Sequence, residues 1–157
     1  MQQNFSLVFD QGCPQILKDI LIPMFEQFHF VVPKWVEDVY VVFENDQDKN
    51  FAVAETLTDI EYRRIFLRFY PDFIYERTDK LYQFVHELVH SIYGSVYNYS
   101  HTTFSSILSG VGDEKLKEHV LDELRKYNEG STQDLTNMLF RMLKLDKRTG
   151  KKIKNVK

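Results

Sequence analysis

The segment His86-Glu87-Leu88-Val89-His90 has the residue types and the spacing of a metal-dependent hydrolytic site. On a helix, residues at positions i and i+4 point the same way, so the imidazoles of His86 and His90 can share one Zn²⁺. Glu87, between them, lies near enough to take a proton from a water bound to that metal. The motif therefore predicts a zinc site with His86 and His90 as ligands and Glu87 as general base.

The predicted helix around this motif has an apolar side that does not need the histidines. At 100° per residue one side collects apolar residues, namely Leu81, Val85, Leu88, Val89, Ile92 and Val96. The histidines fall on another side, whose polar and aromatic residues are typical of a cleft: Asp79, Tyr82, Gln83, Tyr93 and Tyr97. An ordinary solvated helix is the competing interpretation. The agreement of residue types, spacing and helical register favours zinc over it.

A catalytic zinc takes three protein ligands, so one ligand must come from outside this helix. A third histidine six residues after His90 is absent, because position 96 is Val96. Glu118 and Asp122 stand one helical turn apart, so Glu118 could bind the metal while Asp122 orients a histidine ring. Glu118 is the preferred third ligand, and a solvated charged face is the competing interpretation for it. The other candidates, in order of preference, are Glu123, Glu129 and Glu114.

The residues before the motif predict a helix and a small sheet. Residues 14–28 have the 3.6-residue period of an amphipathic helix, which Pro23 is expected to kink or split. Residues 39–43 and 51–54 are short β-forming runs, and the polar residues 44–50 between them predict a hairpin loop. Residues 64–70 alternate between apolar and polar and predict a third strand. We expect these strands to form an antiparallel or mixed sheet.

The motif helix is expected at about residues 79–96, followed by a connection through residues 97–101. Two further helices are predicted at residues 114–128 and 132–145. Residues 128–131, with the sequence Asn-Glu-Gly-Ser, predict a helix end followed by a new cap. This order of a helix, strands and then helices predicts the α+β fold class.

Length and composition predict one domain, which we place at residues 1–146. The chain has 157 residues, of which 43% are hydrophobic, enough for a single core. Cys13 is the only cysteine, so a metal must be held by histidines and carboxylates. There is no signal-peptide pattern and no apolar run long enough to span a membrane, so we expect a cytoplasmic protein.

The last eleven residues, 147–157, form a basic segment. They contain six Lys or Arg and no acid, whereas residues 1–146 carry 14 basic against 23 acidic residues, a net charge of about −9. A flexible, solvated tail is the expected state. Contact with a nucleic acid or an acidic partner is the alternative.

In these features the chain resembles the gluzincin metallopeptidases, and in particular the compact metallopeptidases of phages and mobile elements related to the ImmA/IrrE kind. The resemblance depends on residues 86–90 and on Glu118 with Asp122, and covers about residues 38–127. It implies a zincin-like active-site helix packed on the sheet, with Glu118 completing the zinc site. It also implies that the strand at residues 64–69 holds an extended peptide.

Two functions follow as expectations. The first is a zinc metallopeptidase that hydrolyses a protein or peptide substrate. The second is a catalytically inactive zincin-like module that contacts a protein or nucleic-acid partner. Hydrolysis of a non-peptide amide would use the same metal and base, because the site alone does not define the substrate.

Overall fold

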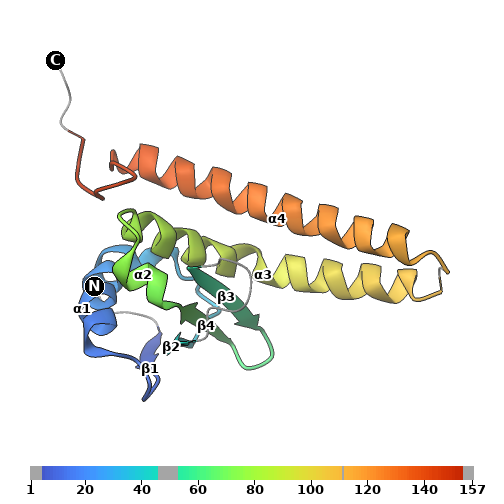
Figure 1. The fold of residues 1–157 in the computed structure, drawn as a ribbon, viewed down its shortest axis with the longest axis horizontal. Helices are drawn as coiled ribbons and strands as arrows, with labels where there is room; N and C mark the ends of the chain where they lie inside the picture. The colour runs from blue at the N-terminus through green and yellow to red at the C-terminus, as the bar shows by residue number, and fades with distance from the viewer. Residues whose placement is uncertain (1–4, 46–52, 111, 154–157) are drawn as a thin grey trace.

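The computed structural model describes residues 5–45, 53–110 and 112–153, and its elements confirm the α+β class (Figure 1). In chain order the elements are β1 (Ser6–Phe9), α1 (Gln15–Phe28), the 3-10 helix η1 (His29–Val31), β2 (Asp38–Phe43), β3 (Ala54–Asp59), β4 (Arg64–Phe69), α2 (Pro71–Tyr75), α3 (Lys80–Leu108) and α4 (Glu114–Met142). None of the described helices combines the length and the apolar character that crossing a bilayer requires.

The four strands form one mixed sheet in the order β1-β2-β4-β3. β1 pairs with β2 and β2 with β4 in parallel, whereas β3 pairs with β4 antiparallel. The predicted hairpin between residues 39–43 and 51–54 is therefore wrong. β3 begins at Ala54 and turns back into β4 around Arg63, whose φ of 54° is left-handed. Of the predicted strand, Phe51 and Ala52 lie outside the described residues.

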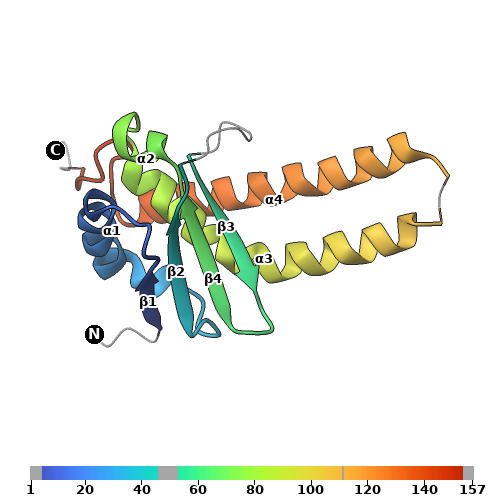
Figure 2. The same cartoon turned by 60° about the horizontal axis from the view of Figure 1, so that its bottom comes forward.

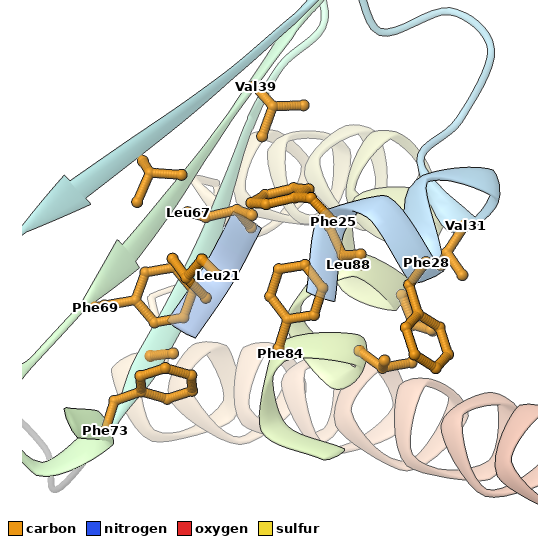
Figure 3. Packing of buried hydrophobic residues seen from close by; sticks show 14 of the residues in the cluster. Leu21, Phe25, Phe28, Val31, Val39, Leu67, Phe69, Phe73, Phe84 and Leu88 are labelled. Atoms are coloured by element: carbon orange, nitrogen blue, oxygen red, sulfur yellow. The ribbon is translucent and has the colours of Figure 1, made fainter. Parts of the chain in front are cut away.

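The core lies between the sheet, α1 and the first half of α3 (Figure 3). β2 and β4 contribute inward-facing residues that are fully buried, namely Val39, Val41, Ile65, Leu67 and Phe69. Phe25 of α1 meets Phe84 of α3 edge to face, with ring centroids 4.7 Å apart. Burying each such side chain stabilises the fold by roughly 1.5–3 kcal/mol. This packing fixes the part of α3 that carries the motif.

α1 runs through Pro23 without a break, so the expected split is absent. The Pro23 ring removes one backbone hydrogen bond and crowds the carbonyl of Asp19. Both residues are exposed, so water can satisfy the freed carbonyl. The burial of four apolar residues on the opposite side holds the helix together, and these are Leu17, Leu21, Phe25 and Phe28.

α3 and α4 form a long antiparallel hairpin whose distal half extends beyond the sheet (Figures 1 and 2). Each helix has 29 residues, or about 43 Å at 1.5 Å per residue. Residues 97–101 are helical rather than a connection, and residues 128–131 lie inside α4 rather than between two helices. A glycine costs a helix about 1 kcal/mol. Packing of the buried α4 residues Thr132, Thr136 and Phe140 outweighs that cost at Gly130.

Candidate metal centre

α3 places the two histidines of the motif side by side. The Nε2 atoms of His86 and His90 lie 3.1 Å apart, and their rings are nearly perpendicular at 89°. Their side chains are only 12% and 14% exposed. Two imidazole nitrogens are thus held close together with little water around them, as the spacing of the motif predicts.

α4 adds a carboxylate to this pair. Glu129 Oε1 lies 3.4 Å from His90 Nε2, and Glu129 Oε2 lies 3.6 Å from His86 Nε2. One ligand atom from each of the three residues lies within 4.8 Å of the other two. Two nitrogens and one carboxylate oxygen are the donor set of a catalytic His₂Glu zinc site, so these residues fit zinc.

The charges of the three groups are coupled. The hydrogen bonds from His86 and His90 hold the pKa of Glu129 well below its usual range. Burial acts to lower the pKa of His90, but the hydrogen bond to Glu129 and the charge of Glu87 outweigh it, so this pKa is raised. A cation at this position is therefore electrostatically favoured, whether it is a proton on His90 or a metal.

The second ring nitrogen of each histidine differs in its surroundings. His90 Nδ1 faces Thr132 Oγ1 at 3.2 Å and Asn128 Nδ2 at 3.5 Å. A proton held on Nδ1 by Thr132 leaves the Nε2 lone pair free to bind a metal. His86 Nδ1 is buried and has no hydrogen-bond partner within the described chain.

Glu87 lies on the side of α3 that faces β3. It is only 5% exposed, and burial raises the pKa of its carboxyl group. Thr56 Oγ1 of β3 lies 2.8 Å from both the backbone oxygen and Oε2 of Glu87. This threonine links the sheet to the helix and fixes the carboxyl group beside the histidines.

The other three candidate glutamates do not join this group. Glu118, the preferred third ligand, stands eleven residues before Glu129 on α4, or about 16 Å along the helix. Glu114 pairs with Lys117, and Glu123 pairs with Lys126. The structure thus brings the histidines together with Glu129, which the sequence ranked third.

The expected helper residue Asp122 is also distant from the histidines. It pairs with Lys126 and Arg125, whose hydrogen bonds lower the pKa of its carboxyl group to about 2. Thr132 and Asn128 take the place next to His90. Neither residue was predicted to contact His90, because residues 128–131 were expected to separate two helices.

A cavity of about 550 Å³ connects the candidate centre with β3. Its walls include Ala54 to Thr58, both histidines, Glu87 and Gly94. A Cβ on Gly94 would lie within 3.0 Å of the Thr58 side chain, so glycine permits the close approach of α3 to β3. Of the expected tyrosines, Tyr97 lines the cavity. Tyr82 is buried and donates a hydrogen bond to Asn137 at 2.9 Å.

Comparison of the chain with protein-family models, with curated proteins and with solved structures finds no match. The assignment of the site depends on its own geometry.

Proposed function

We propose that this protein is a zinc-dependent peptidase in which His86, His90 and Glu129 bind the metal and Glu87 is the general base. The observation that carries the proposal is the convergence of two Nε2 atoms and one carboxylate within 4.8 Å, next to a cavity. The carboxylate comes from 39 residues away in the chain, on a different helix, so local sequence alone does not explain the grouping. Zinc is the metal that this donor set suits best.

The chain's own residues supply the proton transfer. Bound zinc lowers the pKa of a coordinated water and polarises a carbonyl group. Glu87 accepts the proton on its carboxylate and passes it to the leaving amine. Burial raises the pKa of Glu87, which makes its carboxylate a stronger base. Thr56 orients the carboxylate by donating a hydrogen bond to Oε2.

The substrate strand differs from the one that the resemblance implied. β4 (Arg64–Phe69) lies inside the sheet between β2 and β3, so its backbone groups are already paired. β3 is one of the two edge strands, and it lines the cavity. Among the described residues β3 pairs only with β4, so an extended peptide can pair with its outer edge and lie across the histidines, which is a general way of binding peptides.

Substitution of the base separates catalysis from metal binding. We expect Glu87→Gln to retain zinc and to lose at least about 100-fold in the hydrolysis of a fluorogenic peptide library. Glu123→Gln is the matched control, because Glu123 is exposed and outside the group. Full hydrolysis by Glu87→Gln would rule out the catalytic role. Zinc without hydrolysis in the wild-type protein would support the inactive binding module instead.

A further inference from the structure

Residues 145–153 form a folded turn that follows α4, and this turn contains four basic residues, namely Lys147, Arg148, Lys151 and Lys152. Asp146 N donates to Lys151 O at 2.9 Å, and Gly150 N donates to Asp146 O at 2.8 Å. Leu145 and Lys152 form an antiparallel bridge, and Gly150 has a left-handed φ of 65°. The positive charges of this segment therefore have defined positions.

The turn is held by both long helices. Gly150 lies directly against the Leu81 side chain of α3, where a Cβ would clash. Lys147 Nζ donates to Asn137 of α4 and lies 5.4 Å from the ring centre of Tyr82 on α3. These contacts orient the basic side of the turn relative to α4.

A cavity of about 560 Å³ lies between the turn and the end of α4, and four cationic residues line it: Arg141, Lys144, Lys147 and Arg148. Buried apolar residues, Phe140 and Leu145, also line it. Within the described chain no ion pair joins Arg141, Lys144 or Arg148 to an acid. Two cations of the hairpin arm differ, because Lys117 and Lys126 are paired with acids of α4.

Asp146, the acid of the turn, accepts hydrogen bonds from groups within the turn. Asp146 Oδ1 accepts hydrogen bonds from Arg148 N at 3.1 Å, Thr149 N at 2.8 Å and Thr149 Oγ1 at 2.9 Å. These hydrogen bonds stabilise the turn. Asp146 also lines the cavity and interacts electrostatically with Arg148, but it forms no ion pair with Arg141, Lys144 or Lys147 within the described residues. Residues 141–153 contain six Lys or Arg and one acid, whereas the rest of the chain is acidic. The positive charge is thus concentrated at one end of the molecule.

We propose that this cavity and its cationic rim bind the phosphate backbone of a nucleic acid. Lysine and arginine side chains without acidic partners are the groups that contact phosphates, and arginine can contact them with two parallel hydrogen bonds. A duplex carries one charge per about 1.7 Å and releases counterions when several cations engage it together. An acidic peptide has a lower charge density than such a duplex.

The site recognises the backbone and not the bases. Phe140 is 1% exposed, and Lys147 lies over the Tyr82 ring, so neither ring is free to stack on a base. Binding is therefore expected to show little sequence preference and strong salt dependence. Binding of the nucleic acid does not require the metal centre.

Fluorescence anisotropy with a labelled DNA duplex of about 20 base pairs and the full chain tests this proposal. Four phosphate contacts predict that raising the salt from about 50 to about 200 mM weakens binding roughly 100-fold. We expect Lys144→Gln with Arg148→Gln to weaken binding at least about 10-fold and to reduce the salt slope by about 2. The matched control, Lys117→Gln with Lys126→Gln, removes the same charge from the arm and should change binding less than about twofold.

Circular dichroism of each variant verifies folding, and His86→Ala should bind DNA as the wild type does. The proposal is overturned if the wild type does not bind DNA at low salt, or if both double variants lose affinity equally. It is also overturned if polyglutamate or vesicles containing phosphatidylserine bind more tightly than DNA in the same buffer. Either of those results would assign the cavity to a different anion.

Discussion

The Glu129 carboxylate lies 3.4 Å from Nε2 of His90, although the two residues belong to different helices. This contact joins α3 and α4 at the point where the hairpin crosses the sheet edge. It makes the metal centre dependent on the register of the two helices. A substitution that shifts α4 along α3 should therefore weaken metal binding more than it disturbs the packing of the core.

Thr132 is expected to tune the metal affinity through His90. Thr132→Val removes the oxygen that faces His90 Nδ1 at 3.2 Å but keeps the shape of the side chain. Loss of such a partner typically weakens metal binding about 10- to 100-fold, and competition with a chelator measures it. Thr136→Val is the control, because Thr136 is equally buried and bonds only to the helix backbone at Thr132 O. Equal losses in both variants would contradict the role of Thr132.

The metal-free protein should have a defined pH dependence of stability. The pKa of Glu129 is lowered from 4.5 in the folded protein. Its contribution to stability is therefore present above pH 4.5 and is lost as the pH falls from 4.5 toward the lowered value. The pKa of His90 is raised from 6.5, so its contribution is present below 6.5 and is lost as the pH rises through the raised value. Burial raises the pKa of Glu87 from 4.5, so ionisation of this carboxyl group also lowers stability as the pH rises. Thermal unfolding with a chelator should therefore give the highest Tm at mildly acidic pH and lower values on either side.

Glu129→Gln should flatten both limbs of that profile. Zinc should reverse the alkaline limb of the wild type, because it binds the neutral imidazoles and its stabilisation grows with pH. A metal-free wild-type Tm that rises steadily from mildly acidic to alkaline pH would contradict the coupling.

Two glycines in the long helices should respond in opposite directions to alanine. Gly94→Ala brings a methyl group against Thr58 and should destabilise the protein by about 1–3 kcal/mol. Gly130→Ala meets no atom within 4 Å and should stabilise it by about 0.5–1 kcal/mol, because alanine favours a helix. Denaturant unfolding measures both. A stabilising Gly94→Ala would show that α3 does not approach β3 this closely.

The fold class and the motif helix were predictable because they depend on local patterns. The apolar period of α1 and the alternation in β4 correspond to buried residues in the structure. The strand order was not predictable from the same patterns. β1 has only four residues, and the partner of each strand depends on contacts between residues distant in sequence.

The identity of the third ligand depends on where the motif helix ends. Glu118 and Glu129 are eleven residues apart, which is close to three full turns, so both lie on the same side of α4. If the motif helix ended at residue 96, the antiparallel helix that follows would place Glu118 near the histidines. α3 instead ends at Leu108, twelve residues later, and this brings Glu129 to that position. The side of the helix was predictable, whereas the register was not.

Zinc content and affinity of the purified protein test the central claim most directly. We expect about one zinc per chain in the wild type and in Glu118→Ala, and at least about 100-fold weaker binding in His86→Ala and Glu129→Ala. Circular dichroism of the metal-free variants shows whether each is folded. Absence of zinc from the wild type, or retention of zinc by Glu129→Ala with loss from Glu118→Ala, would contradict the site.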